Sequence, residues 1–245
     1  MYKTAIICAM ALLLPLSSQA KSLDNQQKEE VKQLVRETLM DHPEILIEVI
    51  TELRKKEQQQ QAQAQSSALK AHYQELFHDS ADPFAGPKNA KVSLVYFGDM
   101  NCGFCKKQDP ILSEIIKKYK DVRIIYKDLP ILRQSSREAA ALALAAYNQA
   151  PDTYFSLHKR LMSQSSPLDS ATIAEAVKKE GLDIEKLKKA ISPEIDKQLD
   201  DNLRLAQNLG INGTPALVFQ DTVMGGFTEQ SVLAAAIEKR LETGK

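Results

Sequence analysis

Apolar residues recur at helical spacing in the first part of the chain and give way to strand-like runs further on. Residues 21 to about 80 are polar, rich in glutamine and free of glycine. The pattern predicts one helix before Pro43 and a second one after it, because proline is tolerated in the first turn of a helix. The apolar faces of these two helices consist of Val31, Leu34, Val35 and Leu39, and of Ile45, Leu46, Val49, Ile50 and Leu53.

A segment of this size cannot bury two apolar faces by itself. Leu39, Leu46 and Leu53 are seven residues apart and form a short heptad-like seam. We therefore expect residues 23–60 to associate with other copies of the chain. Packing on the rest of the chain and a solvated tail are the alternatives. Residues 54–67 favour helix by composition but lack an apolar face, so this linker is either a rigid helical spacer or a flexible one.

The second part of the chain carries the strand signals. Residues 91–97 and 122–127 are β-rich apolar runs that flank a predicted helix at 102–119. A strand, a helix and a strand in this order predict a right-handed crossover and parallel pairing. The remaining predicted elements are a helical region at 135–209, a strand at 216–219, a second short strand from 223, and a final helix at about 229–241.

The first residues are typical of a secretion signal. Lys3 precedes an apolar run of about a dozen residues, and small residues allow cleavage after Ala20. Residues 1–20 are therefore predicted to be a signal peptide, with an uncleaved membrane anchor as the alternative. Its removal leaves a mature chain with a formal charge of −1. Nothing in this balance indicates nucleic-acid binding.

The number and spacing of the cysteines limit the functions that this chain can have. Cys8 lies in the leader, and the mature chain keeps only Cys102 and Cys105. A disulfide between positions this close closes almost no loop, so it stabilises little, and a chemical role is favoured. An inert bridge and half of a zinc site are the alternatives. Zinc needs about four ligands, and the four histidines of the chain are scattered.

A Cys-x-x-Cys unit at the start of a helix makes its two sulfurs unequal. Unpaired N–H groups and the helix dipole favour the thiolate of the first cysteine. We predict that Cys102 is the nucleophile and that Cys105, one turn inside, resolves the mixed disulfide.

Thr214-Pro215 before a short strand completes the pattern. Together with the Cys-x-x-Cys unit and the helical insertion, it resembles the thioredoxin superfamily, in which this proline is cis and faces the cysteines. The runs FGDMNCGFC, ending at Cys105, and KDLPIL, from Lys127, resemble the bacterial DsbA family. The N-terminal Asp41-His42-Pro43 region is similar to that of stalked relatives, the suppressor-of-copper-sensitivity protein C group.

This resemblance implies an α/β fold of the thioredoxin-like, DsbA-like type. The predicted catalytic domain spans residues 68–245, with a helical insertion at about 134–209. An N-terminal helical oligomerisation stalk and linker at 21–67 precede it. Stalked members of the group are trimers, which makes a homotrimer the expected assembly.

The resemblance also implies the activity. We expect a periplasmic thiol–disulfide oxidoreductase that needs no cofactor and acts on unfolded or wrongly bridged proteins, and that a membrane redox partner resets. Gly103, Phe104, Thr214 and Pro215 are the predicted substrate-binding residues. The Gly-Phe dipeptide lacks a histidine that would stabilise the thiolate further, and this favours an isomerase or reductase. A dithiol oxidase is the alternative, and a Cu(I)-binding protein that uses Cys102 and Cys105 is an alternative of another class.

One position departs from the family pattern. Relatives place a buried carboxylate six positions before the first cysteine, where this chain has Tyr96. Proton transfer to Cys105 is then left to water, Asp99 or a charged group such as Lys127.

Overall fold

The computed structural model describes residues 23–244. They divide into two compact units. The first unit ends at Glu57, and the second begins at Gln58. The predicted signal peptide and its cleavage point lie outside the described residues. Within the described part of the chain, no helix combines the length and the apolar character needed to cross a membrane.

The first unit is built from two helices that meet at a proline, as the hydrophobic pattern predicts. The first, α1, begins with a capping box, in which the Asp24 side chain accepts from the Gln27 backbone N–H and the Gln27 side chain accepts from the Asp24 backbone N–H. It ends at His42, and Pro43 precedes the second helix, α2. The two helices span Asn25–Asp41 (α1) and Glu44–Ala71 (α2).

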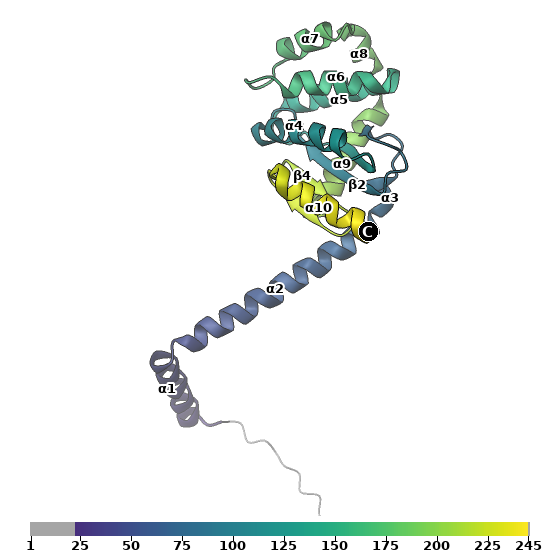
Figure 1. Ribbon diagram of the computed structural model, residues 1–245. Coiled ribbons are helices and arrows are strands. Elements are labelled where there is room, and N and C mark those ends of the chain that lie inside the picture. The colour runs from purple at the N-terminus through teal and green to yellow at the C-terminus, as the bar shows by residue number, and fades with distance from the viewer. Residues whose placement is uncertain (1–22, 245) are drawn as a thin grey trace, which may run out of the picture. The chain divides into compact units, whose positions relative to one another are not determined.

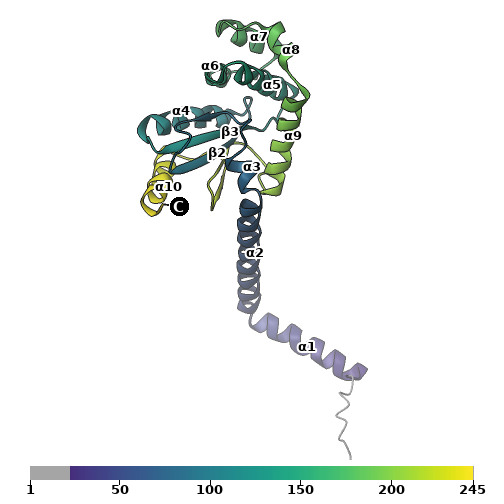
Figure 2. The same ribbon diagram turned by 90° about the vertical axis from the view of Figure 1, so that its right-hand side faces the viewer.

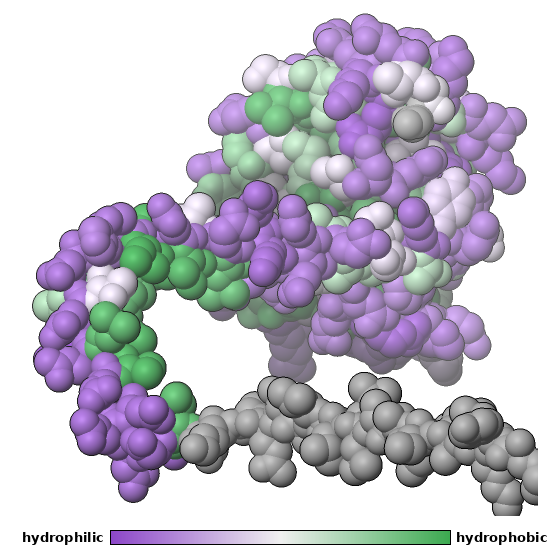
Figure 3. Space-filling model, turned by 90° about the horizontal axis from the view of Figure 1, so that it is seen from below, coloured by the Kyte–Doolittle hydropathy of each residue, from purple (hydrophilic) through white to green (hydrophobic). Residues whose placement is uncertain are grey.

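The apolar faces of both helices are exposed in the single chain. No residue of α1 is buried, and the only buried residue of α2 is Leu69. Figure 3 shows apolar side chains gathered along one side of this helical segment. The exposed large apolar residues of α1 and α2, which we call the stalk stripe, are Val31, Leu34, Val35, Met40, Leu46, Ile47, Val49, Ile50 and Leu53.

The linker is helical. Helix α2 continues without a break to Ala71, past the predicted boundary at residue 67. The predicted heptad-like seam is interrupted in the structure. The seven-residue step from Leu39 to Leu46 crosses the helix break at His42 and Pro43. The stripe therefore consists of two separate helical faces and cannot form one continuous coiled-coil seam.

The second unit is built on a mixed sheet in the strand order β1-β3-β2-β4-β5 (Figure 1). Strands β2 and β3 are parallel, as the strand–helix–strand pattern predicts, and pair Tyr96 with Tyr126. The other pairs are antiparallel. The strands span Phe84–Ala85 (β1), Val92–Gly98 (β2), Val122–Asp128 (β3), Ala216–Val218 (β4) and Val223–Gly225 (β5).

Alternation along the strands gives the sheet two apolar faces. Leu94 and Tyr96 point to one face, which α4 and α10 cover, whereas Val95 and Phe97 point to the other. The second face is covered by α3, the end of α2 and the last turns of α9. These helices span Tyr73–Phe77 (α3), Gly103–Lys118 (α4), Pro193–Asn208 (α9) and Gln230–Thr243 (α10).

A helical insertion separates β3 from β4, as predicted. Its helices α5 to α8 gather beyond α4, and α9 leads back to the sheet (Figure 2). Alanines of α5 fill its centre, because small side chains let the neighbouring helices approach closely. The insertion helices span Gln134–Gln149 (α5), Pro151–Met162 (α6), Ser170–Lys179 (α7) and Ile184–Ala190 (α8), followed by α9. This architecture is the DsbA-like thioredoxin fold, so the predicted fold class is confirmed.

A buried ion pair lies on the second face of the sheet. The Lys127 ammonium is 2.6 Å from Oδ2 of Asp82, and both side chains are 1% exposed. Asn202 Oδ1 accepts from Lys127 at 3.4 Å, and Gln198 donates to the carboxylate of Asp82 at 3.2 Å. Removing one partner of such a pair leaves an uncompensated charge in the interior, which is strongly destabilising.

We predict that Lys127→Met lowers the free energy of unfolding by about 3–5 kcal/mol, since it leaves the buried Asp82 carboxylate without its ion-pair partner. Urea unfolding followed by tyrosine fluorescence measures this, because every tyrosine between residues 23 and 244 lies in the second unit. The control is Lys127→Met with Asp82→Asn, which removes both charges and should recover most of the loss. Equal stability of the single and double variants would contradict the prediction.

Candidate active site

The two cysteines lie at the start of α4, directly after the turn that ends β2. Cys102 is the N-cap residue of α4, and its Sγ accepts a hydrogen bond from the Cys105 backbone N–H at 3.4 Å. Cys102 is 7% exposed and Cys105 is fully buried, and both are free thiols. The helix start therefore leaves the first cysteine slightly exposed and places the other one turn inside, as the spacing predicts.

Strand β4 brings the second predicted segment to the cysteines. It pairs with β2 so that Ala216 is opposite Phe97, which puts Thr214 and Pro215 next to the start of α4. Cys102 Sγ lies 3.2 Å from the Thr214 carbonyl oxygen, to which Cys102 donates when it is a thiol. The Thr214–Pro215 peptide bond is cis, as the resemblance implies. The Thr214 hydroxyl oxygen is buried and has no hydrogen-bond partner among the described residues, so it is free to donate to a thiolate at Cys102.

The surroundings make the two sulfurs chemically unequal. The Cys105 thiol lowers the pKa of Cys102 most, and the Thr214 side chain and the amides of the first helical turn add to this. Burial opposes them, and the resulting pKa of Cys102 is about 5. Burial raises the pKa of the Cys105 thiol, and its hydrogen bond to Cys102 raises it further. At neutral pH the pair therefore holds one thiolate and one thiol.

Two polar residues of the intervening turn hold this geometry. The Asp99 carboxylate accepts from the backbone N–H of Asn101 at 2.7 Å, of Ile131 at 2.9 Å and of Leu132 at 3.0 Å. The Asn101 side chain donates to two serine hydroxyls at the start of α5 and accepts from the Leu168 amide at 2.7 Å. The turn is thus fixed both to the loop after β3 and to the helical insertion.

Apolar side chains are exposed in the segments around the pair. Phe104 is 57% exposed, and its ring centroid lies 6.5 Å from that of Phe227. Ile131 and Leu132, whose amides bind Asp99, are also exposed. A side chain at Gly103 would meet no atom within 4 Å, so the space above the helix start is open. These positions can contact an extended apolar segment that reaches Cys102.

Of the predicted proton-transfer groups, Lys127 lies elsewhere. It alternates with Tyr126 on β3 and pairs with Asp82 on the sheet face opposite to Cys105. Two groups on the Cys105 side were not predicted from the sequence, namely Asp109 and His158, whose Oδ1 and Nε2 atoms are 3.1 Å apart. Asp109 follows Cys105 by four residues on α4, a helical spacing that was the available signal.

No metal-binding cluster accompanies the pair. Among residues 23–244, no group of three or more His, Cys, Asp and Glu side chains has an arrangement that could hold a metal ion.

Comparison with known families agrees with this site. The model of the DSBA-like thioredoxin domain matches residues 93–238, and that of the copper resistance protein ScsC N-terminal domain matches residues 27–60. The fold and the dithiol define a thiol–disulfide oxidoreductase of the thioredoxin class. The chain belongs to the DsbA-like thioredoxin family, and its N-terminal region is of the ScsC type.

Solved structures extend the similarity over most of the chain. Proteus mirabilis ScsC in a transitional conformation is 38% identical with a TM-score of 0.69, covering 90% of this chain and 100% of that one. BcfH of Salmonella enterica Typhimurium is 27% identical with a TM-score of 0.73, covering 87% and 96%.

Curated relatives are more distant. Disulfide bond formation protein D of Bacillus subtilis is 25% identical over 174 residues, which cover 65% of this chain and 77% of that protein. The Na(+)/H(+) antiporter NhaA 1 of Salinispora arenicola is 22% identical over 159 residues, but the chain spans only 24% of its length.

The low pKa of Cys102 gives a direct prediction. Alkylation of the reduced protein by iodoacetamide should follow a titration with a midpoint near 5, because only the thiolate reacts. Thr214→Val removes the hydroxyl that favours the thiolate and should move the midpoint upward. Cys105 should not react in this range, because burial keeps it a thiol. A midpoint near 8.5, the value of a free cysteine, would contradict the assignment.

The same shift predicts how stability depends on pH. The pKa of Cys102 is lower in the folded protein than in the unfolded one, so unfolding takes up a proton between about pH 5 and 8.5. The stabilising contribution is complete above this window and is lost as pH falls through 5. The reduced protein should therefore gain stability relative to reduced Cys102→Ser as pH rises across the window. Asp82 and Asp128, whose pKa values burial raises to about 6, titrate in both proteins and cancel. A pH-independent difference would exclude this linkage.

Proposed function

We propose that this protein is a periplasmic disulfide isomerase or reductase that acts on misfolded or oxidised proteins. The observation that supports this most is the pairing of a Cys102 thiolate, beside the Thr214 carbonyl group, with a buried Cys105 thiol. The thiolate attacks a client disulfide and forms a mixed disulfide with one client sulfur. The client then attacks again to rearrange its bridges, or Cys105 displaces it and releases it reduced.

The substrate-binding role of Thr214 and Pro215 follows from their position. The backbone of Thr214 lies within hydrogen-bond distance of Cys102, at the end of a short strand. An extended client segment can pair with this backbone while its sulfur reaches Cys102. Gly103 leaves room for the segment, and the exposed Phe104 ring offers an apolar contact.

The direction of the reaction rests on the two residues between the cysteines. Neither Gly103 nor Phe104 has a side chain that can donate a hydrogen bond or a positive charge to the Cys102 sulfur. A thiolate that is stabilised less makes the disulfide form less oxidising, which favours isomerase or reductase over oxidase. The pair must then be kept reduced, and we assign this to a membrane redox partner.

Assembly through residues 23–60 completes the proposal. The stalk stripe exposes nine large apolar side chains in the single chain. Exposed faces of this kind mark protein–protein contacts. We infer a homo-oligomer, with three chains as the number that the stalked relatives imply. Several active sites around one client raise the effective concentration of thiols, which suits isomerisation.

The proposed location rests on the leader-like residues 1–20 and on the relatives. One of them, from Salmonella enterica Typhimurium, is described as a periplasmic thioredoxin-like protein, is 34% identical and covers 69% of this chain.

Copper binding is the second candidate function. The family model that matches residues 27–60 is that of a copper resistance protein, and two adjacent sulfurs suit Cu(I), a soft ion that binds thiolates. Tight Cu(I) binding by the reduced protein without reactivation of scrambled ribonuclease would favour this candidate over the isomerase.

The assembly prediction separates an isomerase from an oxidase. Leu46→Glu with Leu53→Glu places two charges on one face of α2 and should dissociate the oligomer into monomers. The monomer should keep wild-type alkylation of Cys102 but reactivate scrambled ribonuclease at least about tenfold more slowly. Deletion of residues 21–67 should have the same effect. Analytical ultracentrifugation gives the mass.

Gln58→Glu with Gln60→Glu is the matched control, because it adds the same charge to a polar stretch of α2. It should remain assembled and active. A monomeric stripe variant that isomerises like the wild type would show that the stalk is not needed for the activity.

A further inference from the structure

The burial of Cys105 conflicts with its role as the nucleophile of the resolving step. To displace a client from Cys102, its sulfur must become a thiolate. Yet Cys105 is fully buried, and burial raises its pKa. The backbone N–H of Asp99 is 3.5 Å from its sulfur, a weak contact. A further group is needed that stabilises negative charge at this sulfur.

The acidic and basic side chains proposed from the sequence are engaged elsewhere. Both carboxylate oxygens of Asp99 already accept backbone hydrogen bonds from the turn and from the loop after β3. Lys127 is on the opposite face of the sheet, bound to Asp82 and Asn202.

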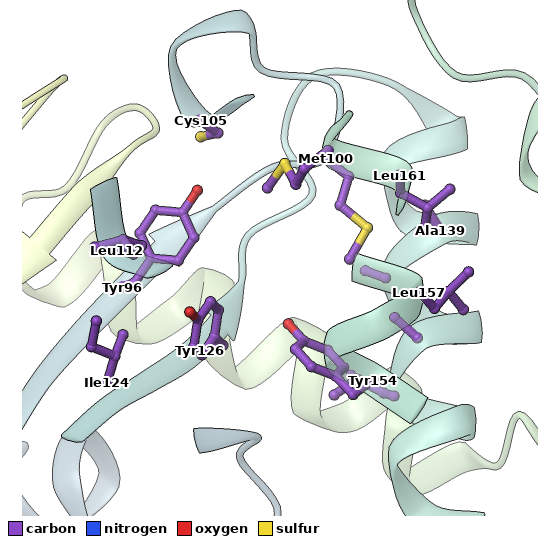
Figure 4. Packing of buried hydrophobic residues seen from close by; sticks show 14 of the residues in the cluster. Tyr96, Met100, Cys105, Leu112, Ile124, Tyr126, Ala139, Tyr154, Leu157 and Leu161 are labelled. Atoms are coloured by element: carbon purple, nitrogen blue, oxygen red, sulfur yellow. The ribbon is translucent and has the colours of Figure 1, made fainter. Parts of the chain in front are cut away.

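Tyr96 has the required position. It lies on β2, on the same face of the sheet as Cys105, and is 1% exposed. Its ring points toward α4, and its hydroxyl group faces the Cys105 side chain (Figure 4). The hydroxyl oxygen is buried and has no hydrogen-bond partner among the described residues. A buried hydroxyl without a partner is costly, and a negatively charged sulfur at Cys105, which this hydroxyl faces, would supply the missing acceptor.

Gly98 keeps this space open. A Cβ atom at this position would lie 2.5 Å from Cζ and 2.6 Å from the hydroxyl oxygen of Tyr96. Real Cβ atoms do not approach other atoms so closely, so the phenol lies directly over the Gly98 backbone. The pair of residues Tyr96 and Gly98 therefore directs the hydroxyl along the strand toward the cysteines.

We propose that Tyr96 is a catalytic residue of the resolving step, in which its hydroxyl donates a hydrogen bond to Cys105 Sγ while that sulfur carries negative charge. This inference rests on the proposed thiol–disulfide exchange and adds a group that acts on the second sulfur only. A charge-assisted hydrogen bond in a buried site is stronger than one between neutral groups.

The step balances without another reactant. The Cys105 thiolate attacks Sγ of Cys102 in the mixed disulfide, and the bond between Cys102 and the client sulfur breaks. The client leaves as a thiolate and takes up the proton that Cys105 released, through water. The enzyme dithiol is oxidised to a disulfide, and the client disulfide is reduced by the same two electrons. Tyr96 keeps its own proton throughout.

The surroundings of Tyr96 support the role of a donor. Burial raises its pKa well above the ordinary value, and the negative charges of Cys105 and Asp109 raise it further. The phenol is therefore not a base at any physiological pH. Conversely, the Tyr96 hydroxyl opposes the rise that burial causes in the pKa of Cys105. The His158 ring lies 3.1 Å from Asp109, so the acid on this side is paired.

Tyr96→Phe removes the hydroxyl and keeps the ring, which tests the proposal. The reduced full-length protein is mixed with a disulfide-bridged peptide, quenched with acid and analysed by mass spectrometry. We expect the mixed disulfide on Cys102 to form at the wild-type rate. It should then resolve about 10- to 100-fold more slowly and accumulate, the range that corresponds to losing one hydrogen bond to a charged group. The Cys102 alkylation midpoint should stay unchanged.

Tyr126→Phe is the matched control, because it removes a hydroxyl from the neighbouring buried tyrosine of the same cluster. It should resolve the mixed disulfide at the wild-type rate. Resolution at the wild-type rate in Tyr96→Phe would overturn the role of Tyr96 and leave the proposed function intact. The absence of a mixed disulfide in the wild-type protein would instead overturn the proposed function.

Discussion

The structure depends on one contact, between the Cys102 sulfur and the free amide end of α4. The backbone N–H of Cys105 points at this sulfur because the first turn of a helix has no internal acceptor. A sulfur at this point is stabilised as an anion while it stays next to solvent. The other features of the site hold this helix end in place. Asp99 fixes the turn before it, and Asn101 ties the same turn to the insertion. Strand β4 brings the Thr214 carbonyl to the sulfur.

Depth along the helix then separates the roles of the two cysteines. One turn of helix moves Cys105 into the apolar layer between α4 and the sheet, where charge is unfavourable. Burial keeps Cys105 as a thiol. This thiol can therefore donate a hydrogen bond to the Cys102 sulfur and stabilise the Cys102 thiolate. The asymmetry is therefore a property of the pair. It also explains why a stabilising group for Cys105 has to come from its packing neighbours, since the sulfur is fully buried.

Patterns that are local in sequence predicted most of the fold. The parallel pair β2 and β3, the helical insertion and the two stalk helices each follow from hydrophobic periodicity or from a proline. The short strand β1 was not predicted, because two residues carry no periodic signal. The heptad-like seam was only partly right, since the step from Leu39 to Leu46 crosses the helix break that Pro43 predicts.

The site divides in the same way. The cysteine pair and the Thr214–Pro215 segment are recognisable because each belongs to a short motif with a known geometry. The ties that hold them are not, because the Asp99 carboxylate reaches amides more than 30 positions away and Asn101 reaches one 67 positions away. The direction of the Tyr96 phenol depends on the ring passing over Gly98. Such contacts arise only from the tertiary fold, and they determine which of the nearby polar groups can act on the sulfurs.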